Sequence, residues 1–403
     1  MPLNTNKYPL ASARLILPLL VMLLLNVSCI NKNNPEQVTD LRSFQHGIDC
    51  IPLDNNKFAL IFSSNGNPPH SSEDNTWQHD IYYAIITDTI PTNESYQTLI
   101  MANEAQEPAS SAMTTDKHIM ITTEDGWQTH NTIAQRYGVY DTNFNPIKPY
   151  PNMVEDGGHS GHVASVNNYF VIFYSEGWIN NDGVDNLGTG DNVKLKTYTS
   201  QGVEIHKMDI AVGDSSRDWW PLLAGSNHYA CLVWQRFVER QNDTDLMVSI
   251  YDPEKNLITQ TIKLEEHVKY YSYNVIYMPE INRFLVTGTY SNNEGFCYLL
   301  DETGTITASH KHLPLGIIRE AKPITRKLTN GTLIMAFPTP PNGINLLEVN
   351  NDNIVYFKNI NVPHQWSTVG MDGFFTNDST LSLIWLSSEG VKQIWIHPFA
   401  NHY

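Results

Sequence analysis

A four-strand pattern that recurs along the chain constrains its fold more than any other feature. The clearest copy lies between His159 and Ile210 and reads as four short strands: Val163–Val166, Tyr169–Tyr174, Val193–Thr199 and Val203–Ile210. Aromatic and β-branched residues dominate the second strand, and the third alternates apolar and polar side chains, as a half-buried strand does. Asn-Asn and Gln-Gly pairs supply the tight turns between them.

The second strand of this pattern can be found seven times. Its copies begin at Phe58, Ile119, Phe170, Ala230, Phe284, Leu333 and Leu381, so neighbouring copies are 48 to 61 residues apart. Four-strand repeats of about this length are typical of β-propellers, whose blades are stable only against their neighbours. The sequence therefore predicts an all-β fold, a seven-bladed β-propeller of four-stranded antiparallel blades. A pair of β-sandwiches is the alternative, but it would need no regular repeat.

The N-terminus has the composition of an export signal. Lys7 and Arg14 precede Leu15–Leu25, an eleven-residue apolar run. A membrane-spanning helix needs about 20 such residues, so the run suits a cleaved signal better than a membrane span. We therefore expect residues 1–28 to be a signal peptide.

The residues after the apolar run are Asn26, Val27, Ser28 and Cys29. A small residue before a cysteine resembles the lipobox of bacterial lipoproteins, although Asn26 departs from the usual Leu. The resemblance implies that Cys29 is lipidated and becomes the mature N-terminus. Ile30 stands where an Asp would resemble an inner-membrane retention signal, so the outer membrane is favoured. An ordinary secretory signal with a chance cysteine is the alternative.

Three regions follow from these patterns: a signal peptide (1–28), a lipidated tether (29–37) and a single propeller domain (38–403). The last propeller strands at the C-terminus leave blade seven one strand short. Residues 36–43 precede blade one and belong to no blade of their own, so we predict that they pair as the outermost strand of blade seven.

Composition excludes some partners. The formal net charge is −17, which disfavours nucleic acid and the surface of anionic membranes, since both attract Lys and Arg. Contact with the membrane is therefore expected through the lipid anchor only. Cys50, Cys231 and Cys297 remain besides the cysteine of the lipobox-like motif, and an odd number cannot pair completely within one chain. Cys231 and Cys297 lie inside apolar runs, so we expect them to be buried thiols.

Long loops on one face of the propeller indicate where a partner binds. The loops between the second and third strands are long in blades one to four, and they contain Trp77, Trp127 and Trp178. The crossings between blades meet the same face around the channel mouth. Their candidate ligand-binding residues are His159, His162, Arg217, Asp218, Trp219, Trp220, Tyr273, Arg319, Glu320 and Trp366. Exposed aromatic side chains with a few charges are typical of recognition surfaces. The alternative is that Trp219, Trp220 and Trp366 pack between blades.

Other chemistry has weaker support. His159 and His162 could ligate a metal only from a loop, because residues three apart on a strand point to opposite faces. Asp182, Asp185 and Asp191 lie in a Gly-rich loop that suits calcium, but the spacing is not that of an EF-hand. Cofactors are therefore not expected, calcium at these aspartates being the one alternative. The pairs Arg217/Asp218 and Arg319/Glu320 could supply carboxylates for glycosidic chemistry, although an adjacent Arg more often forms an ion pair.

The leading functional hypothesis is a non-enzymatic binding module, a lipid-anchored propeller of the cell envelope that presents its aromatic loop face to a protein or a glycan. The alternative is a glycan-active hydrolase or lyase that uses the channel mouth. No catalytic motif decides between them, and propeller folds host both functions.

The lipobox-like motif gives the first testable prediction. Cys29→Ala should move the protein from the membrane fraction to the soluble fraction, because stable anchoring requires more than one acyl chain on that thiol. Fractionation of cells followed by mass spectrometry of the mature N-terminus measures this. A wild-type protein that is soluble and begins at another residue would contradict the prediction.

Overall fold

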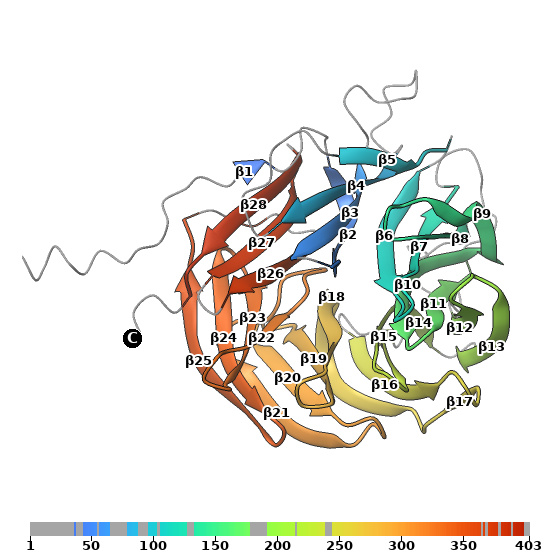
Figure 1. Cartoon of the computed structure of the whole chain (residues 1–403). Helices are drawn as coiled ribbons and strands as arrows, with labels where there is room; N and C mark the ends of the chain where they lie inside the picture. Colours follow the sequence, from blue (N-terminus) through green and yellow to red (C-terminus); the bar gives the residue numbers. More distant parts are fainter. Residues whose placement is uncertain are drawn as a thin grey trace, which may run out of the picture.

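The structure of the protein is a computed structural model. It describes residues 36–37, 43–54, 56–64, 79–87, 96–102, 105–126, 133–177, 192–213, 216–237, 244–363, 366, 370–377, 380–387 and 390–398. These residues form an all-β ring of seven blades around a central axis (Figure 1). Within this part of the chain, no helix has the length and apolar character needed to cross a membrane.

Each blade is a meander of antiparallel strands that runs from the centre of the ring to its edge. Blade one comprises β2 (Ser43–Pro52), β3 (Lys57–Ser64), β4 (Asp80–Thr87) and β5 (Tyr96–Ile100). Blade two comprises β6 (Gln106–Met113), β7 (Ile119–Asp125), β8 (Ala134–Tyr140) and β9 (Pro146–Asp156). Blade three comprises β10 (Gly158–Val166), β11 (Tyr169–Glu176), β12 (Asn192–Thr199) and β13 (Glu204–Ala211).

The fourth and fifth blades share a strand. Blade four comprises β14 (Arg217–Gly225), β15 (Ala230–Phe237), β16 (Thr244–Asp252), the short β17 (Leu257–Ile258) and the first half of β18 (Ile262–Met278). Blade five comprises the second half of β18, β19 (Arg283–Tyr290), β20 (Gly295–Leu300) and β21 (Ile306–Leu313). Residues 262–268 of β18 pair with β16 and residues 273–278 pair with β19, so one long strand is the outer edge of one blade and the inner edge of the next.

The last two blades complete the ring. Blade six comprises β22 (Ile324–Lys327), β23 (Leu333–Thr339), β24 (Gly343–Asn350) and β25 (Asn353–Asn361). Blade seven comprises β26 (Met371–Asn377), β27 (Thr380–Ser387), β28 (Gly390–Ile396) and β1 (Glu36–Gln37). The predicted seven-bladed propeller is confirmed, and all seven predicted second strands are present as β3, β7, β11, β15, β19, β23 and β27.

The second strands are buried on both sides because each blade packs against two neighbours. Six of the eight residues of β11 are buried, and the same is true of β19. Aromatic contacts cross the blade boundaries: Phe173 meets Trp234 edge to face at 5.9 Å, and Phe58 stacks on Phe374 at 3.9 Å. Each fully buried side chain of this size contributes roughly 1.5–3 kcal/mol, so the interfaces between blades hold the ring together.

The seam between blade seven and blade one is closed by the N-terminal segment. Glu36 and Gln37 pair with Gln393 and Lys392, so β1 is the outermost strand of a blade that otherwise comes from the C-terminus (Figure 1). This confirms the predicted clasp for Glu36–Gln37. Of the predicted clasp, residues 38–42 lie outside the described residues, and Ser43 belongs to β2 instead, because it pairs with Ser64 in blade one.

The clasp gives the second prediction. Deletion of residues 30–42, which leaves β2 intact, should lower the free energy of unfolding by roughly 1–3 kcal/mol, because each lost ladder hydrogen bond contributes about 1 kcal/mol and the edge of β28 is exposed. Urea unfolding of the soluble domain measures the change. A deletion variant as stable as the parent would show that these residues are a plain tether.

Candidate functional site in the central channel

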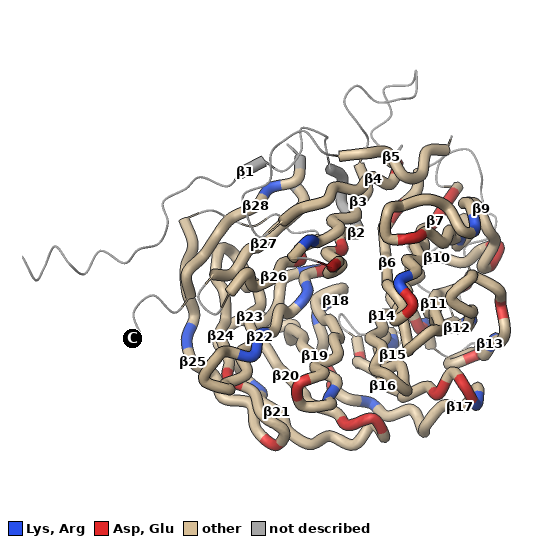
Figure 2. Tube along the Cα trace, viewed as in Figure 1, with Lys and Arg blue, Asp and Glu red and all other residues tan. Residues whose placement is uncertain are grey.

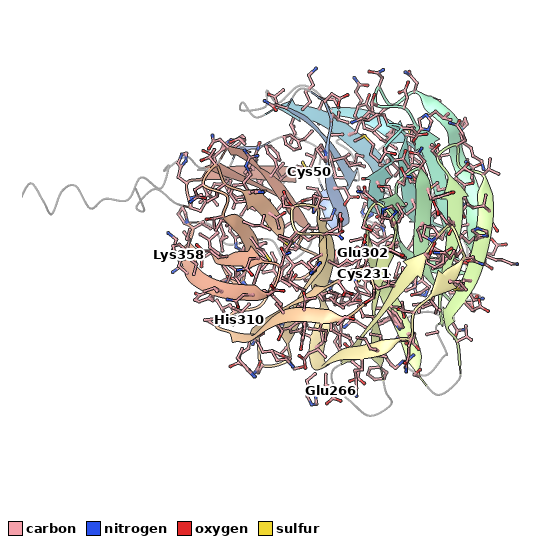
Figure 3. The ribbon with its side chains drawn as sticks, turned by 60° about the horizontal axis from the view of Figure 1, so that its bottom comes forward. Cys50, Cys231, Glu266, Glu302, His310 and Lys358 are labelled. Carbon is pink, nitrogen blue, oxygen red and sulfur yellow. The ribbon has the colours of Figure 1, made fainter. Side chains whose placement is uncertain are left out.

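A cavity of about 540 Å³ occupies the central channel of the ring. Its walls are the inner strands of blades one to five, completed by Glu320 and Lys322 just before blade six. Cys50, labelled in Figure 3, lies on β2 in this wall, whereas His310 and Lys358 lie on strands at the perimeter. Cavities that hold small ligands in other proteins have volumes of about 300–1,000 Å³, so the channel has room for a small ligand.

A repeated backbone feature shapes the channel mouth. Where the chain enters the ring from the previous blade, one residue takes a positive φ: Gly47 (77°), Ser160 (52°), Trp220 (51°), Tyr271 (56°), Glu320 (57°) and Gly370 (69°). Register shifts accompany the residues in β2, β10, β14 and β18, so these four are parts of bulges, whereas Glu320 and Gly370 lie just before β22 and β26. Two positions after Gly47, Ser160 and Glu320 are the channel-lining residues Asp49, His162 and Lys322.

The glycine at the first of these bulges is required by space as well as by φ. A Cβ at Gly47 would lie 2.1 Å from the backbone nitrogen of Ala109 on the next inner strand. Only a residue without a side chain allows β2 and β6 to approach this closely at the channel mouth.

An ion cluster lies where blades six, seven and one meet. The Lys322 ammonium contacts Asp49 Oδ1 and, at 3.2 Å, Asp372 Oδ2. The two carboxylates accept further hydrogen bonds, Asp372 from the Cys50 backbone N–H at 2.8 Å and Asp49 from the Ser111 hydroxyl at 2.7 Å. Basic and acidic positions accordingly lie side by side near the ring centre, around the inner ends of β2 and β26 (Figure 2).

Burial and charge set the protonation of this ion cluster. Burial raises the pKa of Asp372 above its usual value, although the charge of Lys322 opposes the rise. Burial alone would lower the pKa of Lys322, but the adjacent Asp372 and Asp49 raise it well above its usual range. Lys322 is therefore a permanent cation, with about a third of its side chain (32%) exposed to the channel.

His162 provides an uncharged polar group opposite this cluster. Its Nδ1 lies 3.0 Å from the carbonyl oxygen of Ser160. A carbonyl can only accept, so Nδ1 donates and the neutral ring presents Nε2 as an acceptor. Burial lowers the pKa of His162, which favours this neutral form. The imidazole also meets Trp220 edge to face at 5.6 Å.

Two more polar side chains complete the described wall. The Ser110 hydroxyl accepts the Val163 backbone N–H at 3.1 Å and so keeps its own hydrogen for a further acceptor. Asn274 also lines the cavity and has both a donor and an acceptor. The channel wall thus offers both donors and acceptors beside an aromatic ring.

The expected exposed aromatic surface is not formed by the crossing residues. Trp219, Trp220, Tyr273 and Trp366 are all buried. The Arg217 guanidinium covers Trp219 at 3.7 Å, and Trp366 donates to the Gly343 carbonyl at 3.1 Å while meeting Trp385 edge to face. These rings fill the wedges between blades, because the bulges turn them away from solvent. They support the fold, and of the four only Trp220 reaches the cavity wall.

The predicted arginine–acid pairs are present as ion pairs, with a change of partner in one case. Arg319 Nε donates to Glu320 Oε1 at 2.8 Å. Asp218, in contrast, accepts from Arg236 Nε at 2.8 Å and from the Trp234 indole at 2.7 Å. Both carboxylates are therefore neutralised by a guanidinium, which disfavours a role for either as a catalytic acid or base.

The two histidines of the metal hypothesis have different surroundings. His159 is buried away from the cavity, its Nδ1 lies 3.0 Å from the Ser160 hydroxyl, and burial lowers its pKa to about 3. His162 faces the channel instead. Across the described ranges, no three His, Cys, Asp or Glu side chains are grouped so that they could hold a metal ion.

Several predicted residues lie outside the described residues. They are Cys29, Trp77, Trp127, Trp178, Asp182, Asp185 and Asp191. Sequence reasoning also missed Asp49, Lys322 and Asp372 as site residues. Each stands two residues after a crossing residue of positive φ, namely Gly47, Glu320 and Gly370.

Comparisons with known proteins show the fold alone. No family model and no curated protein matches the chain. It is similar to an ulvan lyase of polysaccharide lyase family 25 bound to -[GlcA(1-4)Rha3S]-, with 8% identity, 90% of this chain and 96% of that chain covered, and a TM-score of 0.55.

It is also similar to the WD40 domain of Toxoplasma gondii coronin (8% identity, 91% and 87% covered, TM-score 0.54). A third similar structure is the GH93 α-L-arabinofuranosidase of Fusarium graminearum with arabinobiose (10% identity, 91% and 98% covered, TM-score 0.52). Propellers of this shape thus include glycan-active enzymes and WD40 domains, and this chain is a β-propeller.

The ion cluster gives the third prediction. Lys322→Met should destabilise the protein by about 3 kcal/mol or more, because it leaves two buried carboxylates without their cation. Loss of the Lys322 cation raises the pKa of Asp372 further above the ordinary 3.8. A folded-state pKa above the unfolded value gives stability that is full below about pH 4 and lost as the pH rises through the folded pKa. The deficit should therefore be smallest at about pH 4 and grow toward about pH 8.

Lys255→Met is the matched control, because Lys255 forms an exposed pair with Asp252 at 2.6 Å and is 65% exposed. It should change stability by less than about 0.5 kcal/mol. Urea unfolding at several pH values measures both variants. If the loss of stability in Lys322→Met does not vary with pH, the ion cluster of Lys322, Asp49 and Asp372 is contradicted.

Proposed function

We propose that the protein is a lipid-anchored binding module of the cell envelope, and that it takes a sugar unit of an envelope glycan into the mouth of its central channel. The observation that carries this proposal is the mixed polar wall of the cavity. The Lys322 ammonium, the His162 Nε2 acceptor and the Ser110 hydroxyl are arranged around it beside the Trp220 ring. Sugar hydroxyls both donate and accept, and sugar C–H faces pack on aromatic rings, so this wall suits a glycan.

A recessed cavity favours a small glycan unit over a folded protein partner. Protein interfaces depend on exposed aromatic and Arg anchors over about 800 Å² of surface on each partner. Trp219, Tyr273 and Trp366, which would supply such anchors, are buried. The tryptophans of the long loops lie outside the described residues, and a protein partner on that face is an outcome that the binding test below distinguishes.

A glycan-active enzyme is the second candidate, and one observation favours it. Asp49 and Asp372 both contact the same ammonium, so their carboxylates lie close together, as the paired carboxylates of retaining glycosidases do at about 5–5.5 Å. The raised pKa of Asp372 would suit an acid. Lys322 lies between the two groups, however, and would have to leave before either could reach a glycosidic bond. Binding without turnover therefore accounts better for the geometry.

Glycan binding can be tested with a soluble form that begins at residue 30. It should bind one or more components of a glycan array that includes envelope polysaccharides, and His162→Ala should weaken that binding by about tenfold or more, because a hydrogen bond and an aromatic edge are lost. His312→Ala is the matched control, since His312 is 71% exposed and pairs with Glu294 outside the cavity. It should leave the affinity unchanged.

The same preparation distinguishes the other functions. Release of new sugar ends from a bound glycan, lost in Asp49→Asn, would establish the enzyme instead. An array without any bound glycan, together with an envelope protein captured by the wild type and equally by His162→Ala, would place the partner on the loop face and contradict the proposed function.

A further inference from the structure

We propose that the channel selects an uncharged sugar over one that carries a carboxylate. This inference rests on the proposed function and names its ligand class. It follows from the way in which the one cation that lines the described wall is already paired with two carboxylates.

Three acidic or basic side chains other than that of His162 line the described wall: Asp49, Glu320 and Lys322. The single cation, Lys322, contacts two carboxylates, those of Asp49 and Asp372. An anionic ligand would therefore approach an ammonium that is fully compensated, with more negative than positive charge behind it. At this short range and away from bulk water, the extra carboxylate would be repelled by an amount that outweighs one hydrogen bond.

The carboxylates of Asp49 and Asp372 likewise have their hydrogen-bond donors within the cluster. Asp49 Oδ1 contacts Lys322, and Asp49 Oδ2 accepts from the Ser111 hydroxyl and backbone. Asp372 Oδ2 accepts from Lys322 and the Cys50 backbone, while its Oδ1 accepts from the Gly373 backbone at 2.7 Å. Both carboxylates are thus held next to the ammonium.

The groups that keep spare hydrogen-bonding capacity are the ones that suit hydroxyls. An ammonium has three donors, and two of those of Lys322 are used by the aspartates, so one is left to donate. His162 Nε2 accepts, because its Nδ1 already donates to Ser160. The Ser110 hydroxyl can donate, since its oxygen already accepts the Val163 N–H. None of these three groups requires a charged partner.

Other titratable groups near His162 support the neutral site. Asp49, Glu320 and Lys322 all act on the His162 ring from other blades, and their opposing effects leave burial as the dominant influence on its pKa. The Glu320 carboxylate is itself paired with Arg319 at 2.8 Å. The imidazole therefore remains uncharged beside the ligand.

Matched sugars provide the test. The soluble protein is titrated with array components in pairs that differ only at one group, a hexose against the corresponding uronic acid. We expect the hexose of a bound pair to bind at least about tenfold more tightly than the uronic acid. Equal or tighter binding of the uronic acid would overturn the inference and leave glycan binding intact. Failure to bind any pair would contradict the proposed function instead.

A charge variant sharpens the result. Asp49→Asn/Asp372→Asn keeps the shapes of both side chains but leaves Lys322 without a counter-charge. It should raise the affinity for the uronic acid member about tenfold or more relative to wild type. If thermal unfolding shows that the double variant does not fold, the single variant Asp49→Asn is tested in its place. An unchanged preference in a folded variant would show that these carboxylates do not determine selectivity. Asp252→Asn, on the exposed Lys255 pair, is the control and should change neither affinity.

Discussion

Closure of the ring is the constraint on which the rest of this structure depends. Each blade is apolar on both faces, so a blade without two neighbours would expose its core. The seam between blades seven and one is the place where closure must be made from distant parts of the chain. It is tied at the perimeter by Glu36–Gln37 on β28, and at the channel by Asp372, which accepts the Cys50 N–H and contacts Lys322.

The contacts of Asp372 at the channel also explain why the candidate site lies at the channel mouth. The Lys322 backbone N–H donates to the Met371 carbonyl at 2.9 Å, and this fixes its side chain next to Asp372. Asp49 is placed on the other side of the ammonium by the bulge at Gly47. Three blades thus contribute one charge each to a compensated cluster, and the neutral His162 faces it from blade three. Structural closure and the proposed ligand selection use the same residues.

The fold could be predicted from the sequence because its signal is repeated. An apolar second strand beside an Asn- or Gly-rich turn occurs seven times, and any single ambiguous copy is resolved by the others. The clasp was predictable because strand counting left blade seven incomplete. The site was less accessible. Trp219 and Trp366 attract attention as aromatic residues in crossings, but whether a crossing residue faces solvent or a wedge depends on the bulge, and a positive φ at Ser160 or Glu320 is not evident from residue type. Lys322 could have been noticed only by its place two residues after Glu320, a residue of positive φ.

Hydrogen exchange of the soluble protein, with and without a glycan that it binds, tests the account most directly. If the channel mouth is the binding site, the ligand should slow exchange in residues 47–52, 108–113, 162–165 and 274–277, which line the cavity. The outer strands β5, β13 and β25 should exchange as before. Slower exchange on those outer strands with an unchanged channel would contradict the central claim, because the ligand would then occupy the perimeter of the ring.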